Sequence, residues 1–121
     1  MATALIIDDN RQTADALRQM LDVLGVEARV AYGSSPAISL LQAMTPHLIL
    51  LDINMPGVDG LEILLFLRRE PRLARVPVIV ITSDDQPETR ERVMKDGATA
   101  VLIKPATLDG LEGALKKAGI M

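Results

Sequence analysis

The sequence contains no cysteine, no tryptophan and only one histidine, and these gaps exclude several classes of protein. Without cysteine there is no disulfide scaffold, no thiolate zinc site and no cysteine nucleophile. A single histidine, His47, is too few for a multi-histidine metal centre within one chain. Because His47 stands directly before an apolar segment, we expect it to lie at the surface.

Long hydrophobic runs are also missing. Apolar runs such as residues 48–51 are far shorter than the roughly 18 residues that a membrane-spanning helix needs. The start of the chain has no basic segment of the kind found in secretory signals, and Asp8 and Asp9 interrupt the first apolar run. We therefore expect a soluble, cytoplasmic protein that does not contact a membrane.

Positive charge is not in excess. The chain carries 13 Lys and Arg against 16 Asp and Glu, for a net charge of −3. It lacks the positive field that attracts nucleic acid. One dense basic stretch, residues 68–75, is expected to be a solvated helix end and loop. Binding to nucleic acid is not expected.

Aromatic residues are almost absent, since only Tyr32 and Phe66 occur in a chain that is 49% hydrophobic. The core must therefore be aliphatic, which suits helices packed on a buried sheet. A length of 121 residues allows one core, so we expect one domain over residues 1–121.

Apolar segments of strand length alternate with helix-like segments. Strands are predicted at residues 4–7, 26–31, 47–52, 77–81 and 100–103. Helices are predicted at about residues 11–24, 61–69, 87–95 and 108–118. One more helix is predicted to begin at Pro36, with Ser35 as its cap. Its apolar stripe would be Ile38, Leu41 and Met44. Connections of this length join parallel strands, which predicts a doubly wound α/β fold.

Two of these helices have unusual compositions. The segment at residues 61–67 has more apolar residues than one buried stripe needs. Core packing accounts for some of them, and the others could contact a partner or a second copy of the chain. The core set is Leu61, Leu64 and Leu65, and the possible contact set is Ile63, Phe66 and Leu67. The helix at residues 87–95 has few apolar residues beyond Val93 and Met94, so its attachment to the sheet should be the weakest.

Polar residues follow four of the predicted strands, and in a parallel sheet such ends meet at one edge, where ligands bind. They are Asp8 and Asp9, Asp52, Thr82 to Asp84, and Lys104 with Pro105. Three carboxylates in contact repel one another by roughly 4 kcal/mol per pair at an effective dielectric near 20. Oxygen ligands without histidine or cysteine favour Mg²⁺.

A carboxylate beside a metal, a lysine and a hydroxyl is placed to attack phosphorus. Asp52, at the end of the most buried predicted strand, is that nucleophile, and an aspartyl phosphate would result. Asp8 and Asp9 would hold the metal, while Lys104 and Thr82 would bind the phosphoryl group. Taken singly, each motif has a simpler interpretation: residues 8–9 and 82–84 could cap helices, and residues 104–105 could be an ordinary loop.

Together, in this order, the motifs resemble the receiver domain of two-component response regulators over about residues 3–118. The matching segments are residues 7–10 (IDDN), 51–60 (LDINMPGVDG), 81–83 (ITS), 97–98 (GA) and 104–105 (KP). The resemblance implies a flavodoxin-like fold with five helices and a five-stranded parallel sheet in the order 2-1-3-4-5.

The resemblance also implies a role for each site residue. Asp52 is the phosphoacceptor, Thr82 supplies a hydroxyl that moves toward the phosphoryl group, and Lys104 is the basic partner. The Mg²⁺ ligands implied are Asp9, Asp52 and the backbone carbonyl of Asn54, with Asp8 acting largely through water. The remaining pocket and switch positions are Ser83, Asp84, Val101 and Pro105. The Lys104–Pro105 peptide is expected to be cis. Asn54 and Asp84 stand at positions that tune hydrolysis of the aspartyl phosphate.

Two positions depart from the family pattern. An aromatic residue is usual three residues before the lysine, where this chain has Val101, and another often follows the Lys-Pro pair, where it has Ala106. Neither side chain belongs to the acid site, so the phosphorylation chemistry is expected to survive. The aromatic part of the switch cannot operate in the usual way.

The sequence therefore predicts a signalling phosphoacceptor rather than a classical enzyme. With Mg²⁺, it would take a phosphoryl group from a sensor histidine kinase or a histidine phosphotransfer protein, and would assist its own phosphorylation and dephosphorylation. Output would pass to an unidentified protein target, with a homodimer possible. Two alternatives stay open: a phosphorylation-independent binding module, and an aspartyl phosphatase, which the Asn54 position and the lack of a cap domain disfavour.

Overall fold

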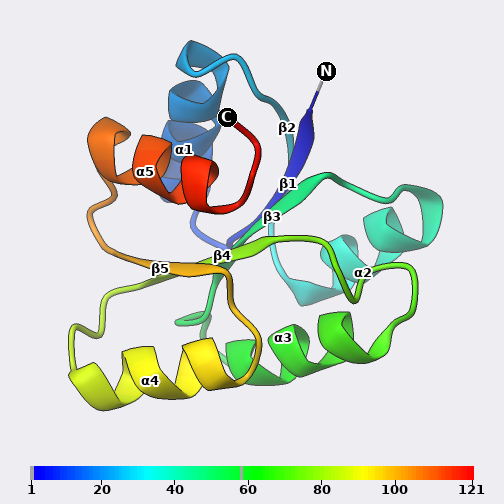
Figure 1. Cartoon of the computed structure of the whole chain (residues 1–121). Coiled ribbons are helices and arrows are strands. Elements are labelled where there is room, and N and C mark those ends of the chain that lie inside the picture. The colour runs from blue at the N-terminus through cyan, green and yellow to red at the C-terminus, as the bar shows by residue number, and fades with distance from the viewer. Residues whose placement is uncertain (1, 58) are drawn as a thin grey trace.

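The computed structural model describes residues 2–57 and 59–121. Met1 and Val58, which the predicted domain and the motif at residues 51–60 include, lie outside the described residues. Strands and helices alternate along the described chain (Figure 1). The strands are β1 (Thr3–Ile7), β2 (Glu27–Ala31), β3 (Leu48–Asp52), β4 (Val78–Thr82) and β5 (Ala100–Ile103). The helices are α1 (Arg11–Val23), α2 (Ser34–Ala43), α3 (Gly60–Arg69), α4 (Pro87–Lys95) and α5 (Leu108–Lys117).

The five strands form one parallel sheet in the order β2-β1-β3-β4-β5. Helices α1 and α5 cover one face of the sheet, and α2, α3 and α4 cover the other (Figure 1). This arrangement confirms the predicted fold class and strand order. It also brings the carboxyl ends of all five strands to a common edge.

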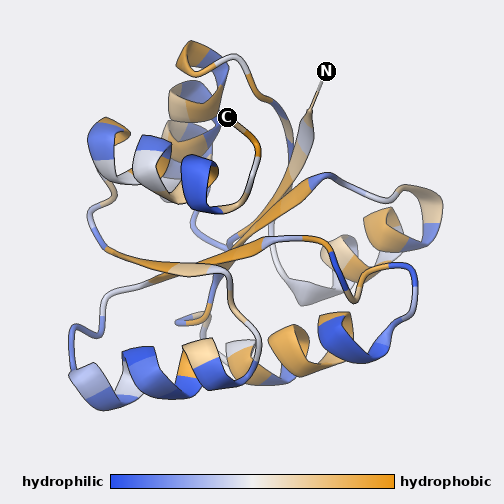
Figure 2. Cartoon of the chain, in the orientation of Figure 1, coloured by the Kyte–Doolittle hydropathy of each residue, from blue (hydrophilic) through white to orange (hydrophobic). Residues whose placement is uncertain are grey.

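The core consists of two aliphatic layers, one on each face of the sheet. Every residue of β3 and β4 is buried, as expected for central strands covered on both faces. The first four residues of strand β2 alternate between exposed and partly buried, as expected at an edge, and only its last residue, Ala31, is fully buried. Figure 2 shows hydrophobic residues along the central strands and hydrophilic residues on the outer sides of the helices.

Side-chain caps begin three of the helices. The Asn10 side chain accepts a hydrogen bond from the Thr13 N–H at 3.0 Å and begins α1. Asp59 caps α3 in the same way, and Thr107 caps α5. Because Asn10 is the cap of α1, the two aspartates before it are free for other contacts.

The predicted start of α2 is wrong. The helix begins at Ser34, with Gly33 as its N-cap, so Ser35 is not the cap and Pro36 is the third helical residue. Gly33 has a φ of 127°, a conformation that glycine adopts without strain. Proline is tolerated throughout the first turn because the N–H groups there have no partner within the helix. Of the predicted stripe, Leu41 is buried, Ile38 is 42% exposed and Met44 caps the helix.

The predicted division of α3 between core and surface is also partly wrong. Leu64 and Leu67 are fully buried, because their three-residue spacing places both on the side that faces the sheet. Leu67 is therefore not available to a partner. Leu65 is only half-buried, and Phe66 is 38% exposed. Leu61 and Ile63 are half-buried at the margin of the core.

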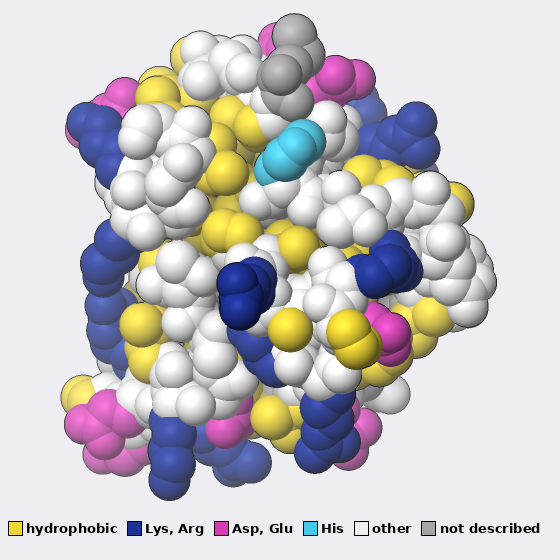
Figure 3. Space-filling view, turned by 45° about the vertical axis from the view of Figure 1, so that its right-hand side comes forward, with side chains coloured by type: hydrophobic (Ala, Val, Ile, Leu, Met, Phe, Trp, Pro, Cys, Tyr) yellow, Lys and Arg dark blue, Asp and Glu magenta, His cyan; other side chains and the backbone are white. Residues whose placement is uncertain are grey.

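The basic stretch at residues 68–75 is more ordered than predicted, because Arg68 is not a solvated side chain. Its Nε donates to the Gly97 carbonyl at 2.9 Å, and its Nη1 donates to the Val76 carbonyl at 2.8 Å. Burial lowers the pKa of the Arg68 guanidinium. Arg69 and Arg75 are exposed, as expected. Figure 3 shows basic side chains at several separate places on one face of the molecule, with acidic ones among them.

Helix α4 has the weak attachment that its composition predicts. Val93 is its one buried residue, and Met94 is 36% exposed. Its N-cap, Gln86, forms no side-chain capping hydrogen bond. No helix within the described ranges is long and apolar enough to cross a membrane.

Candidate functional site

The predicted site residues meet at the carboxyl edge of the sheet. Asp8 follows β1, Asp52 ends β3, Thr82 ends β4 and Lys104 follows β5. Two of them, Asp52 and Lys104, line a pocket of about 340 Å³. The residues that line this pocket are Asp9, Asn10, Asp52, Asn54, Pro56 and Lys104.

Three carboxylates form the acidic part of the site. One oxygen atom each from Asp8, Asp9 and Asp52 lies within 4.8 Å of the other two. Asp8 is fully buried, Asp52 is 4% exposed and Asp9 is exposed at the mouth. The convergence that the sequence predicted is therefore present in the structure.

Asp8 has one oxygen that is satisfied and one that is not. Its Oδ1 accepts a hydrogen bond from the Asn10 N–H at 2.9 Å, while Oδ2 is buried and has no partner among the described residues. Burial raises the pKa of Asp8 to about 6, and the nearby negative charge of Asp52 also raises it. The hydrogen bond from the Asn10 N–H and the positive charge of Lys104 lower this pKa but do not cancel the effect of burial. A buried carboxylate oxygen without a donor is suited to a cation.

Asp52 is held at both oxygens. Its Oδ1 accepts from the Asn54 N–H at 2.8 Å, and its Oδ2 pairs with the Lys104 ammonium at 3.1 Å. Lys104 is in turn anchored by its own N–H, which donates to the Thr82 carbonyl at 2.8 Å. The site thus combines one ammonium with three carboxylates, and the ammonium pairs with Asp52. The remaining negative charge, carried by oxygen ligands alone, fits a hard divalent cation such as Mg²⁺.

The Thr82 hydroxyl is buried and makes its hydrogen bond with Asn54 rather than with Asp52. Its Oγ1 donates to the side-chain Oδ1 of Asn54 at 2.8 Å. The Ser83 N–H donates to the same oxygen at 2.9 Å. The sequence predicted the Asn54 backbone carbonyl as a metal ligand and residue 54 as a position that tunes hydrolysis. It did not predict this side-chain contact, because no motif reveals which side chains meet between the ends of β3 and β4.

Asp84 connects Thr82 with the start of α4. Its N–H donates to the Thr82 hydroxyl oxygen at 3.0 Å. Its carboxylate accepts from the Gln86 N–H at 2.9 Å and from the Thr89 hydroxyl at 2.5 Å. The hydrogen bond from Thr89, followed by that from Gln86, lowers the pKa of Asp84. Asp84 therefore anchors α4 although Gln86, not Asp84, is the N-cap.

The two positions that lack aromatic residues belong to the two apolar layers, one on each face of the sheet. Val101 is 7% exposed in the core, and Ala106 is half-buried. An apolar pocket of about 430 Å³, lined in part by Leu17, Met20 and Ala106, opens on the α1 side of Lys104. The Lys104–Pro105 peptide is cis, as the sequence resemblance implied.

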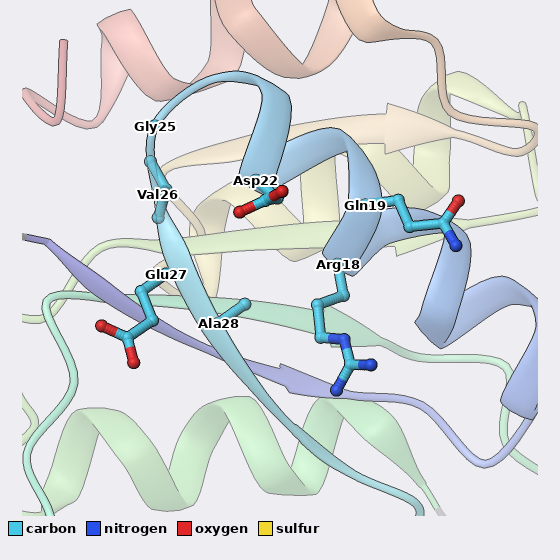
Figure 4. Close-up of a pocket in the computed structure, with 7 residues that line it drawn as sticks. All are labelled: Arg18, Gln19, Asp22, Gly25, Val26, Glu27 and Ala28. Carbon is cyan, nitrogen blue, oxygen red and sulfur yellow. The ribbon is translucent and has the colours of Figure 1, made fainter.

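A larger depression, of about 570 Å³, lies between the end of α1 and β2 (Figure 4). Arg18, Asp22 and Glu27 lie around it, and all three are exposed. Among the described residues that line this depression none is a buried titratable group, so it offers no comparable chemistry.

Comparison with known proteins gives consistent results. A family model described as the response regulator receiver domain matches residues 4–116. The polar-differentiation response regulator DivK of Brucella anthropi is 29% identical over 106 residues, covering 88% of this chain and 86% of that protein. An uncharacterized 14.6 kDa protein of Leptolyngbya boryana is 35% identical and covers 89% of this chain and 81% of its own length. The chemotaxis protein CheY4 of Vibrio cholerae has a TM-score of 0.89 at 26% identity, with 98% of both chains covered.

Proposed function

Because this chain belongs to the response regulator receiver domains of two-component signal transduction, we propose that Asp52 accepts a phosphoryl group from a phosphohistidine. Receivers of this family are phosphoacceptors that interact with histidine kinases or phosphotransfer proteins. The observation that carries the proposal for this chain is the pairing of a buried Asp52 carboxylate with Lys104 inside a cluster of acidic residues.

In the proposed reaction, a carboxylate oxygen of Asp52 forms the new O–P bond. The P–N bond of the phosphohistidine breaks, and its electron pair stays on the histidine nitrogen. The Asn54 N–H holds one carboxylate oxygen at 2.8 Å and so fixes the plane of the nucleophile. The Lys104 ammonium lies 3.1 Å from the other oxygen. Once the new bond has formed, this ammonium can pair with a phosphoryl oxygen instead of with the Asp52 carboxylate.

The family binds Mg²⁺ at an acidic pocket, and the residues of this chain fit that ion. Asp8, Asp9, Asp52 and the backbone carbonyl of Asn54 would hold it. When bound, Mg²⁺ neutralises charge that develops on the phosphoryl oxygens. The buried and unpaired Oδ2 of Asp8 is the feature that supports such a site.

Phosphorylation would change protein contacts through α4 and its neighbours. Helix α4 contributes only Val93 to the core, so a small change at its start can shift it. Water in the open pocket could later hydrolyse the aspartyl phosphate, which would end the signal. The partners would be a sensor histidine kinase or phosphotransfer protein and a downstream protein, with a homodimer possible through exposed apolar residues such as Phe66.

Intact-mass measurement tests the proposal. Wild-type protein, Asp52→Ala and the matched control Asp22→Ala are incubated with Mg²⁺ and a small phosphodonor. We expect one phosphate-sized gain in mass on wild type and on Asp22→Ala, and none on Asp52→Ala. No gain on wild type, or an equal gain on Asp52→Ala, would contradict the proposal.

A further inference from the structure

We propose that the side chain of Asn54 is a positioning residue that holds the Thr82 hydroxyl in a resting position, and that Asp84 transmits the release of this hydroxyl to α4. This inference rests on the proposed function of Asp52. It assigns to the Asn54 amide a role separate from that of its backbone carbonyl.

The Asn54 side-chain oxygen is fully occupied by donors from the end of β4. It accepts from the Thr82 hydroxyl at 2.8 Å, from the Ser83 N–H at 2.9 Å and, more weakly, from the Ser83 hydroxyl at 3.4 Å. A carbonyl oxygen has two lone pairs, which the two short bonds satisfy. The Asn54 N–H, meanwhile, donates to Asp52. Asn54 therefore contacts the nucleophile through its backbone and Thr82 through its side chain.

The Thr82 hydroxyl has one proton, and in the resting structure it is donated to Asn54. The side chain is fully buried, so water is not an alternative acceptor. To donate to a phosphoryl oxygen on Asp52, the hydroxyl must first leave Asn54. The two hydrogen bonds exclude each other, and the hydroxyl therefore has two alternative positions.

Asp84 links these positions to α4. Its N–H donates to the Thr82 hydroxyl oxygen, and its carboxylate holds the Gln86 N–H and the Thr89 hydroxyl. Movement of the hydroxyl removes the acceptor of the Asp84 N–H. Since the N-cap of α4 forms no side-chain hydrogen bond, the start of this helix depends on Asp84. This chain of hydrogen bonds runs from Asp52 to α4 without an aromatic residue at position 101.

A double-mutant cycle tests the resting position. Binding of Mg²⁺ and beryllofluoride, a phosphoryl mimic, is followed by NMR titration for wild type, Asn54→Ala, Thr82→Val and the double variant. Removal of the Asn54 amide releases the hydroxyl, so Asn54→Ala should bind about 5-fold more tightly, or about 1 kcal/mol. In the Thr82→Val background the same substitution should change the affinity less than about 2-fold. Gln19→Ala, an exposed amide, is the matched control and should match wild type.

The amide resonances of Gln86 and Thr89 test the link to α4. In unliganded Asn54→Ala they should move part of the way toward their positions in beryllofluoride-bound wild type. If these resonances do not move, the proposed role of Asp84 is wrong. The proposed role of Asn54 is wrong if Asn54→Ala gains no affinity, or if it gains the same affinity with Thr82 present as in the Thr82→Val background. If neither wild type nor any variant binds beryllofluoride, the proposed function of Asp52 fails as well.

Discussion

Gly60, the first residue of α3, lies directly against the backbone of Ile53, the residue that follows Asp52. A Cβ atom at position 60 would overlap the Cα, Cβ and Cγ2 atoms of Ile53. Gly60 is buried, so the overlap could not be relieved toward solvent. The absence of a side chain at this position therefore allows α3 to pack against the segment that carries Asp52 and Asn54.

Substitution of Gly60 by alanine should displace that segment. We expect the free energy of unfolding to fall by about 1–3 kcal/mol, as for other overpacked sites, and phosphoryl uptake at Asp52 to slow. Gly113→Ala is the control, because Gly113 lies within α5 and, apart from its chain neighbours and the adjacent helix backbone, no atom lies within 4 Å of its Cβ position. There alanine should stabilise by up to about 1 kcal/mol. Urea unfolding of both variants gives the comparison, and equal effects would contradict the role of Gly60.

The buried carboxylate of Asp8 should destabilise the protein when Mg²⁺ is absent. Its pKa is raised from 3.8 to about 6 in the folded state. The folded protein therefore binds more protons between these values, and stability is lost as the pH rises through about 6. Wild type should lose about 1 kcal/mol in free energy of unfolding between pH 5 and pH 7 from this group. Asp8→Asn should be more stable at pH 7 and less dependent on pH.

Urea unfolding at the two pH values checks this, with the exposed Asp22→Asn as control. Millimolar Mg²⁺ should stabilise wild type and have a much smaller effect on Asp8→Asn, since a bound ligand stabilises only the state that binds it. If Asp8→Asn is less stable than wild type at pH 7 without Mg²⁺, the Asp8 carboxylate does not destabilise the folded protein as we predict.

Lys104 should compete with Mg²⁺ for Asp52. Its ammonium lies 3.1 Å from the Asp52 Oδ2 and offsets part of the negative charge of the site. Lys104→Met should therefore bind Mg²⁺ about 3- to 10-fold more tightly, while accepting the phosphoryl group more slowly because the ammonium is lost. Isothermal titration with Mg²⁺ measures the first effect. Lys117→Met, at the end of α5 and exposed, should show no change, and weaker Mg²⁺ binding by Lys104→Met would contradict the competition.

The sequence was sufficient to predict the sheet and the acidic cluster because both depend on simple patterns. Buried strands appear as unbroken apolar runs, and residues that follow parallel strands must meet at one edge. This is why Asp8, Asp52 and Lys104 could be brought together from the sequence alone. Their roles in phosphoryl transfer stay predictions, as does the single domain over residues 1–121.

Other features depend on tertiary contacts that no local pattern records. Whether Leu65 or Leu67 is buried depends on the rotation of α3 against the sheet. The contact between the Asn54 side chain and Thr82 depends on how the loop after β3 passes the end of β4. The start of α2 was misplaced because proline fits at several positions of a first turn, and the positive φ of Gly33 decided among them.

Arg68 supplies the last prediction, because its guanidinium joins segments that are distant in the sequence. It donates to the carbonyls of Gly97 and Val76 at 2.9 and 2.8 Å, and at 3.3 Å to that of Ala74, so it ties the end of α3 to the loops before β4 and β5. Arg68→Ala would leave these carbonyls without their donor and should lower the free energy of unfolding by about 2–3 kcal/mol. Lysine has a single ammonium and cannot reach all three acceptors, so Arg68→Lys should recover less than half of the loss. Arg69 is the exposed neighbour of Arg68, and Arg69→Ala should change the free energy of unfolding by less than about 0.5 kcal/mol. Urea unfolding compares the two alanine variants. If they behave alike, the Arg68 guanidinium contributes no more than a surface charge.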